Sequence, residues 1–201
     1  MSRPTAPVAP GADRPGRGTV PAGPDPAVPT DGDVRWDVVP PTCDVAQQVL
    51  TEYFDDIVGR YWGRAATPAE VTSAMADEPS DDLQGASGLL LVGTVGETPV
   101  ACGGVRLAEG TVGDLTRIFV APAARGRRLG VELVRRLERL AWEAGVRTLR
   151  LDVRADLAQA RTLYRRLGYV DVPPFSDARY ADHWMAKELT APAQTSSAPT
   201  V

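Results

Sequence analysis

The chain has 201 residues, with 22 Lys and Arg against 26 Asp and Glu and a formal net charge of −4 at pH 7. This length suits one domain with tails, and a hydrophobic content of 43% is ordinary for a soluble globular chain. The acidic balance argues against a nucleic-acid partner, which normally meets a basic surface. With one histidine and two cysteines outside any CxxC pair, no Cys/His zinc site is expected, and we expect no metal.

The chain also contains no apolar run of 18 residues and no apolar segment near residue 1. We therefore expect no membrane span and no secretion signal, and the two cysteines suit free thiols in a reducing compartment. These features predict a cytoplasmic protein without a membrane partner.

Residues 1–33 are rich in Pro, Gly and Ala and contain no aromatic residue, and residues 190–201 have a similar composition. Such segments bury too little apolar surface to offset the entropy lost on ordering. We expect both to be disordered tails, which leaves residues 34–189 as the folded unit.

The first half of that unit predicts one strand and two helices. "VRWDVV" at 34–39 suits a short strand, and the apolar residues of 43–64 recur at helical spacing. "TPAEVTSAMA" predicts a short helix with Thr67 as N-cap, Pro68 at the first position and Glu70 completing a capping box.

The second half predicts three consecutive strands at 88–95, 98–108 and 111–121, then a helix from Arg127 to Ala144 that stops at Gly145. A strand at 147–153, a helix at 156–168, and strands at 169–172 and 181–189 follow. This order predicts a single α/β domain of the mixed α+β kind, with a mostly antiparallel sheet and helices on both faces.

The start of the helix near Arg127 lacks the usual capping side chains. No residue from Ala121 to Val131 is acidic, hydroxylated or an amide, while the segment carries three arginines and two glycines. Free N–H groups and the helix dipole at such an end favour an anion, although solvation of the N–H groups and of the arginines by water is the simpler possibility.

Two familiar phosphate-binding loops fit this segment poorly. The Walker pattern GxxxxGK[ST] is absent. The dinucleotide pattern GxGxxG is also absent, since Gly126 and Gly130 give only GxxxG, although Asp152 stands 22 residues after Gly130 where an acidic residue is expected. A dinucleotide-binding domain therefore stays a weak alternative.

The segment "RIFVAPAARGRRLGVELVRRLERLAWEAGVRTLRLDV", followed by "ARTLYRRLGY", resembles the core of the GNAT superfamily of acetyl-CoA-dependent N-acetyltransferases. The resemblance covers Leu89 to Tyr169. It implies acetyl-CoA as the donor cosubstrate and a small amine or a protein amine as the acceptor, with a homodimer as one possible state.

The resemblance also implies roles for individual residues. Tyr164 would protonate the departing thiolate, and Asp114 would draw a proton from the amine through water. The backbone of Ile118, Phe119 and Val120 would pair with the pantetheine arm. The pyrophosphate would be wrapped by Arg125, Gly126, Arg127, Arg128, Leu129 and Gly130.

Two positions depart from the family pattern. Arg128 stands at the inner glycine position of the loop, which is tolerable if its dihedral angles are helical, and Leu157 stands where the family often has Asn. The second departure mildly favours an alternative function, a catalytically silent acyl-CoA-binding regulatory module.

The two catalytic candidates also suit purely structural roles. Asp114 suits a turn after Gly113, and Tyr164 suits a core aromatic, while His183 is a second candidate base. An acidic mouth that favours a cationic amine is suggested by four carboxylates: Asp55, Asp56, Asp177 and Asp182.

Overall fold

The computed structural model describes residues 34–108, 110–177 and 180–191. The disorder predicted for residues 1–33, and for all but the first two residues of the C-terminal tail, therefore lies outside the described residues. Among the described helices, none combines the length and the apolar character that crossing a membrane requires.

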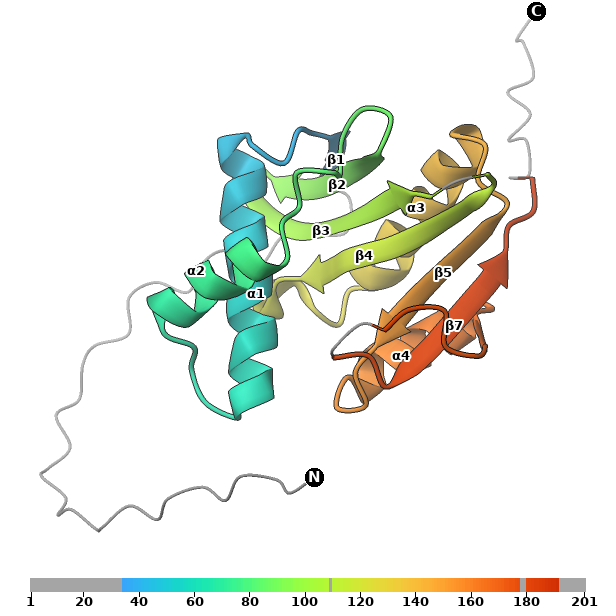
Figure 1. Ribbon diagram of the computed structural model, residues 1–201. Helices are drawn as coiled ribbons and strands as arrows, with labels where there is room; N and C mark the ends of the chain where they lie inside the picture. The colour runs from blue at the N-terminus through green and yellow to red at the C-terminus, as the bar shows by residue number, and fades with distance from the viewer. Residues whose placement is uncertain (1–33, 109, 178–179, 192–201) are drawn as a thin grey trace, which may run out of the picture.

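A seven-stranded sheet forms the centre of the domain, in the order β1-β2-β3-β4-β5-β7-β6 (Figure 1). Neighbouring strands run antiparallel except for β4 and β5, which run parallel. A single parallel pair confirms the predicted mixed, mostly antiparallel sheet and does not suit a doubly wound dinucleotide fold. The strands are β1 (Arg35–Val38), β2 (Gly88–Val95), β3 (Thr98–Leu107), β4 (Val112–Val120), β5 (Thr148–Val153), β6 (Val170–Asp171) and β7 (His183–Glu188).

Four helices cover the two faces of this sheet, as predicted. The helices are α1 (Asp44–Trp62), α2 (Pro68–Asp77), α3 (Leu129–Glu143) and α4 (Ala158–Arg166). Leu133 and Leu137 of α3 and Tyr164 of α4 pack on one face against Leu149 and Leu151 of β5 and their neighbours. The opposite face of β2–β4 packs on α1 through a second apolar cluster that includes Leu50 and Phe119.

A local sequence signal explains the start of α2 but not the start of α3. The capping box of α2 is present, with the Glu70 N–H donating to Thr67 Oγ1 and the Thr67 N–H donating to Glu70 Oε2. The prediction that the third helix begins near Arg127 is wrong. A 3₁₀ turn at Pro122–Ala124 precedes it, and α3 begins at Leu129, with Arg128 as N-cap at a left-handed φ of 62°.

Strands β4 and β5 pair over a short distance and then separate. Their register covers three pairs, from Val112 opposite Thr148 to Asp114 opposite Arg150. Beyond these pairs the strands diverge, as Figure 1 shows. The edge of β4 that faces β5 therefore has no strand partner from Leu115 onward, and its backbone polar groups there need other partners.

Candidate functional site

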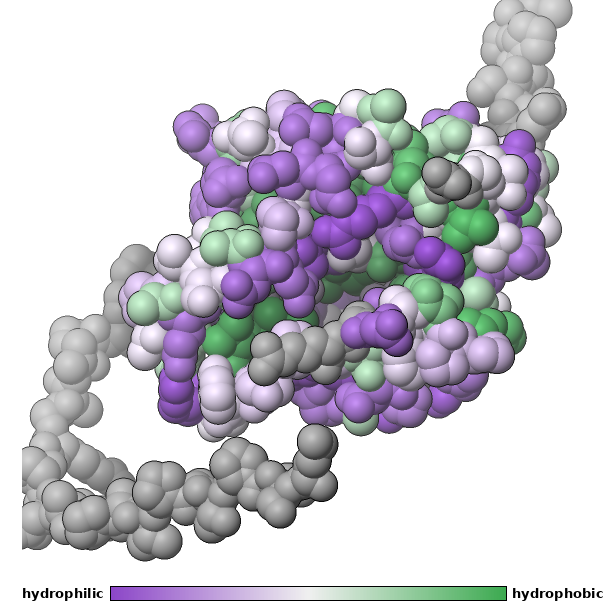
Figure 2. Space-filling view, viewed as in Figure 1, coloured by the Kyte–Doolittle hydropathy of each residue, from purple (hydrophilic) through white to green (hydrophobic). Residues whose placement is uncertain are grey.

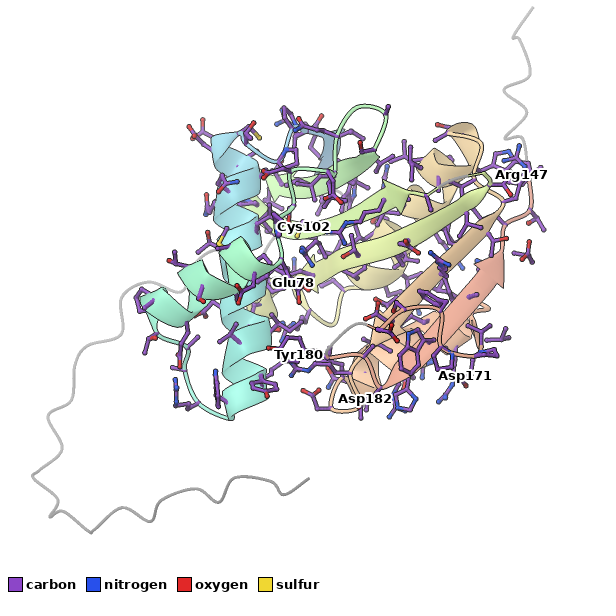
Figure 3. All side chains as sticks on the ribbon, viewed as in Figure 1. Glu78, Cys102, Arg147, Asp171, Tyr180 and Asp182 are labelled. Atoms are coloured by element: carbon purple, nitrogen blue, oxygen red, sulfur yellow. The ribbon has the colours of Figure 1, made fainter. Side chains whose placement is uncertain are left out.

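A large cleft of about 1660 Å³ opens where β4 and β5 diverge. Its walls come from α1, α2 and the loop after α2 on one side, and from β5 and the start of α4 on the other. Figure 2 shows the hollow with hydrophilic residues gathered along its rim and hydrophobic residues deeper inside. Figure 3 shows Glu78 and Tyr180 reaching toward this opening from different segments of the chain.

The loop at the start of α3 carries a row of unused donors. Among the described residues, the backbone N–H groups from Gly126 to Gly130 donate no hydrogen bond, and Arg128 supplies no side-chain cap. Gly126 has φ 82°, and no atom lies within 4 Å of where its Cβ would be. Free N–H groups at a helix start favour an anion, so this loop fits a pyrophosphate.

The three arginines of this loop differ in their partners. Arg125 is already engaged, because its Nε donates to the Val120 carbonyl at 2.9 Å and its Nη2 contacts Asp56 Oδ1 at 3.1 Å. The side chains of Arg127 and Arg128 contact no described residue through a hydrogen bond or an ion pair. Arg125 thus ties the loop to α1, and the other two guanidinium groups are available to a phosphate.

The predicted strand segment Ile118, Phe119 and Val120 lies along the unpaired edge of β4. The side chains of these residues point to different faces of the sheet. Phe119 packs in the apolar cluster that faces α1, and Ile118 packs against the apolar cluster that contains residues of α3 and α4. The groups that all three residues can present to a ligand are therefore their backbone N–H and C=O groups. One of these acceptors, the Val120 carbonyl, already accepts a hydrogen bond from Arg125. The segment therefore fits a ligand with amide groups that can pair as a strand does.

Tyr164 lies on α4 with its ring buried and also lines the cleft. Its hydroxyl makes no hydrogen bond with any described residue. Burial, followed by the nearby Tyr53 and Asp152, raises the pKa of Tyr164, so its proton is retained at neutral pH. The side chain is both a core aromatic and an available donor.

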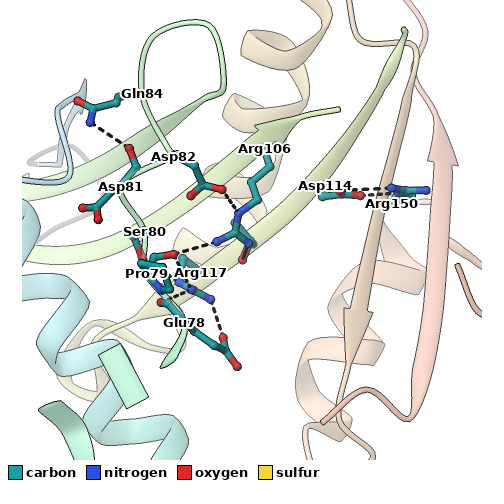
Figure 4. Close-up of polar contacts among 11 residues, drawn as sticks. Glu78, Pro79, Ser80, Asp81, Asp82, Gln84, Arg106, Asp114, Arg117 and Arg150 are labelled. Atoms are coloured by element: carbon teal, nitrogen blue, oxygen red, sulfur yellow. Dashed lines mark hydrogen bonds and ion pairs between the residues drawn. The ribbon is translucent and has the colours of Figure 1, made fainter. Parts of the chain in front are cut away.

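Asp114 lines the cleft at the last paired position of β4, opposite Arg150 in the register. Both of its oxygens are engaged by that arginine, through Nε and through Nη2 at 3.4 Å (Figure 4). The Arg150 guanidinium in turn lies over the Phe175 ring at 4.3 Å. Asp114 is thus in the predicted place but is held in an ion pair.

A buried arginine fixes the loop between α2 and β2. Arg117 sits at a β-bulge of β4 with φ 55°, opposite Gly103, where a Cβ would lie 2.7 Å from Ile118 Cδ1. Its guanidinium donates to Ser80 Oγ, to both the carboxylate and the carbonyl of Glu78, and to the Pro79 carbonyl (Figure 4). Arg106 holds the same loop through Asp82 and the Pro79 carbonyl.

The suggested acidic mouth does not form. Asp56 is bound to Arg60 and Arg125, and Asp182 accepts from the Ala155 N–H. Asp55 and Asp177 do not line the cleft. The carboxylates that line the cleft come from α1, α2, the loop after α2, β4, β5 and the segment after β5: Asp56, Glu70, Asp77, Glu78, Asp81, Asp82, Asp114, Asp152 and Asp156.

His183 and Leu157 also have defined positions. His183 does not line the cleft, and its Nε2 lies 2.8 Å from Arg161 Nη1, so it has no access to a substrate there. Leu157 lines the cleft as N-cap of α4 without a capping hydrogen bond. No group of three or more His, Cys, Asp or Glu suited to a metal occurs among the described residues.

Asp152 is the main site residue that sequence reasoning missed as a cleft carboxylate. The strand "TLRLDV" buries Leu149, Leu151 and Val153, and this alternation puts Arg150 and Asp152 on the opposite face. Two charged residues on one face of a central strand were the available signal. Glu78 had no such signal, because its position depends on the buried Arg117.

Comparisons with known proteins bear on the family and the fold of the chain. A family model described as "Acetyltransferase (GNAT) family" matches residues 52–169, which is more than half of the chain. The chain is 39% identical over 79 residues to "IAA acetyltransferase" of Azospirillum brasilense, and 42% identical over 62 residues to "Probable glucosamine 6-phosphate N-acetyltransferase 2" of Oryza sativa subsp. japonica. These matches cover 39% and 31% of this chain, and they span 52% and 36% of the two relatives.

Solved structures share the fold at low sequence identity. An acetyltransferase of the GNAT family from Staphylococcus aureus superposes with a TM-score of 0.64 at 12% identity, covering 78% of this chain and 99% of the other. A PaiA N-acetyltransferase from Thermoplasma acidophilum, solved with coenzyme A, gives 0.58 at 16% identity, covering 77% and 99%. The family match and this shared architecture lead to one conclusion: the chain belongs to the acetyltransferase (GNAT) family.

Proposed function

We propose that this chain transfers an acetyl group from acetyl-CoA to a primary amine. One observation carries the proposal: the consecutive unused N–H groups of residues 126–130 lie at the end of an unpaired strand edge. The unused N–H groups suit a pyrophosphate, and the unpaired strand edge suits the amide-containing arm that coenzyme A carries next to its pyrophosphate. Family membership and two similar acetyltransferases support the same activity.

The loop residues divide the binding work in this proposal. Gly126 to Gly130 donate backbone N–H groups to the pyrophosphate, and Arg127 and Arg128 add positive charge around it. Arg125 acts indirectly, because its contacts with Asp56 and the Val120 carbonyl hold the loop against α1 and β4. The β4 backbone from Ile118 to Val120 pairs with the pantetheine amides.

Tyr164 assists the departure of the thiol. A thiol has an ordinary pKa of about 8.5, and burial raises the pKa of Tyr164 above its ordinary value of 10.0. The hydroxyl therefore holds its proton until negative charge develops on sulfur, donates a hydrogen bond to it, and gives up the proton as another arrives from solvent. The family resemblance gives amine deprotonation through water to Asp114, and that role would require its ion pair with Arg150 to open.

An acceptor panel tests the activity. The purified chain is incubated with acetyl-CoA and 1,4-diaminobutane, glucosamine, a lysine-containing peptide or 4-methoxyaniline, and thiol release is followed together with binding of coenzyme A. We expect turnover with at least one alkylamine. Binding of coenzyme A without turnover of any amine would favour the silent acyl-CoA-binding module, and absence of binding would contradict both functions.

Tyr164→Phe tests the proposed acid, because it removes one oxygen and keeps the ring that fills the core. Turnover should fall by a factor of about 10²–10⁴, the usual contribution of a positioned acid. Affinity for coenzyme A and the melting temperature should change little, since the packed volume is nearly conserved. Normal turnover with reduced stability would make Tyr164 a core residue alone.

A further inference from the structure

Asp152 occupies a place in the cleft that no other described carboxylate shares. It lies on β5 two residues beyond Arg150, where the pairing of β4 with β5 ends, so it lies just past the point at which the strands separate. Its neighbours Leu151 and Val153 are buried on the opposite face of the strand, which turns Asp152 toward the cleft. Its carboxylate thus lies in the cleft just past the paired part of β4 and β5.

The partners of the cleft carboxylates set Asp152 apart from Asp114. Arg150 engages both oxygens of Asp114, Arg117 engages Glu78, and Arg106 engages Asp82. The Asp152 side chain forms no hydrogen bond or ion pair with any other residue that the structure describes. A base must have a free oxygen, and within this part of the cleft Asp152 supplies one without first breaking an ion pair.

The surroundings of Asp152 disfavour its charged form. Glu78 from the loop after α2 and Asp114 from β4 add negative charge, Arg106 of β3 opposes them, and Tyr164 of α4 and Trp184 of β7 are neutral. Desolvation, followed by Glu78 and Asp114, raises the pKa of Asp152. A carboxylate with a raised pKa is more basic than one with an ordinary pKa, and an incoming cation stabilises its charged form.

We propose that Asp152 binds the protonated amine of the acceptor and accepts its proton, which makes the acceptor a cationic alkylamine. This inference rests on the proposed acetyl transfer and names the acceptor class of the same site. It assigns to Asp152 the deprotonation that the family resemblance gives to Asp114, and leaves Asp114 with Arg150 as a positioning pair at the floor of the cleft.

The protons and bonds balance in this scheme. The ammonium gives one proton to an Asp152 oxygen, which passes it to solvent. The neutral nitrogen then attacks the thioester carbonyl carbon, forming a C–N bond while the C–S bond breaks and its electron pair stays on sulfur. Tyr164 gives its proton to the thiolate, and the second proton lost by the nitrogen returns through water to the tyrosine oxygen.

Asp152→Asn tests the assignment with the panel alkylamine of highest turnover. An alkylamine with a pKa of about 10.4 is almost wholly protonated at pH 7, so kcat/KM at pH 7 should fall by a factor of about 10²–10⁴. The deficit should shrink as pH rises toward 10, because more of the amine is already neutral. With 4-methoxyaniline, which is neutral at pH 7, the variant should lose far less.

A matched control removes the same charge elsewhere in the cleft. The Asp81 side chain lines the cleft from the loop after α2 and contacts no described residue through a hydrogen bond or an ion pair. Asp81→Asn should keep kcat/KM for both amines within about twofold. Equal losses in the two variants would reduce the role of Asp152 to general electrostatics and would contradict the assignment.

Stability provides a readout that does not depend on activity. The folded pKa of Asp152 lies above its ordinary 3.8, so the charged form is disfavoured by folding. This penalty is absent below pH 3.8 and present once pH exceeds the raised pKa. Asp152→Asn should therefore melt higher than the wild type at pH 7, with the difference vanishing at acid pH. A lower melting temperature at pH 7 would make Asp152 a structural residue.

The two proposals fail in different ways. Wild-type turnover of an alkylamine with the same kcat/KM and pH profile in Asp152→Asn would contradict the inference and leave the proposed function intact. Absence of wild-type turnover with every amine, despite a folded chain, would contradict the proposed function first.

Discussion

Arg128 is the residue at which sequence preference and backbone geometry disagree most. It holds a left-handed φ of 62° as N-cap of α3, where the family pattern places a glycine. That conformation costs an ordinary residue about 1–2 kcal/mol, whereas glycine costs about 0.5–1 kcal/mol in extra unfolded-state entropy. Strain that persists at a candidate phosphate site points to a use for the side chain.

Arg128→Gly should therefore stabilise the fold and weaken the site. We expect the free energy of unfolding to rise by about 0.5–1 kcal/mol, the difference between those two costs. Affinity for coenzyme A should fall, more at low salt than at high salt, because one cation is lost. Denaturant unfolding and calorimetric titration of coenzyme A measure the two effects.

Arg127→Ala is the control that separates the expected gain in stability from the expected loss of coenzyme A affinity. It also removes one unpartnered guanidinium from the loop but does not relieve the positive φ at residue 128. It should lower coenzyme A affinity without the gain in stability. Unchanged affinity in both variants would mean that the phosphates do not contact these arginines.

The sequence patterns together with the family resemblance singled out Tyr164 and Asp114, and both line the cleft. They did not predict that Arg150 holds Asp114 or that Arg125 holds Asp56. Both pairs join segments distant in sequence, and 22 basic residues against 26 acidic ones leave too many possible pairings. Whether Asp152 has an ion-pair partner depends on the same choice among many possible pairings, so the sequence could not predict that it has none among the described residues.

The loop between α2 and β2 shows how one strand residue organises another element. Arg117 is almost fully buried, and its guanidinium lies over the rings of Tyr53 and Phe54 while donating to three successive residues, Glu78, Pro79 and Ser80. Burial of such a charge is tolerated only when its donors are matched. The loop that carries Glu78 into the cleft is thus set by Arg117.

Arg117→Lys should loosen this loop. A lysine has one nitrogen in place of the planar fork and leaves part-buried acceptors of the loop unmatched, each at a cost of about 1–3 kcal/mol. We expect a loss of about 2–3 kcal/mol in the free energy of unfolding, with faster proteolysis within residues 78–82. Arg106→Lys, at a partly exposed position, should cost under about 1 kcal/mol. Similar losses in the free energy of unfolding for both variants would mean that Arg117 fixes the loop no more strongly than Arg106 does.

At the level of elements, sequence patterns predicted the type and order of every described α-helix and strand, but not the 3₁₀ turn at Pro122–Ala124. The start of α3 was misplaced by two residues, because glycine normally signals a left-handed position and Arg128 hides it. The capping box of α2 was readable because each of its residues acts on the next few in the chain. Local signals predicted local structure, and the bulge at Arg117, which depends on β3, was not among them.

The sheet at the centre of the molecule has two parts that are joined only by a short paired segment, which we call the seam. Strands β1–β4 and strands β5–β7 meet through three residue pairs, from Val112–Thr148 to Asp114–Arg150. The sequence gives no sign of this, since β4 and β5 each alternate along their full length. The separation of β4 from β5 depends on how the two parts of the sheet pack on α1, α3 and α4. This packing involves residues from the whole domain, so no single segment of the sequence predicts it.

Acetyl-CoA should act as a bridge across this seam. At 100 times its dissociation constant a ligand adds about 2.7 kcal/mol, which for a chain of this size raises the melting temperature by about 5–10 °C. NAD, which the loop does not suit, should give no shift. A shift with NAD and none with acetyl-CoA would contradict the proposed site.

Hydrogen exchange distinguishes bridging from binding at the loop alone. A ligand that enters between the strands replaces the missing strand partner, so amide exchange should slow along β4 beyond Asp114, along β5 beyond Arg150 and across residues 126–130. The paired segment Val112–Asp114 should change little, because its amides are already protected. Protection confined to residues 126–130 would mean that the phosphates bind while the arm stays outside the gap, and the thioester would then lie too far from Asp152 and Tyr164 to react.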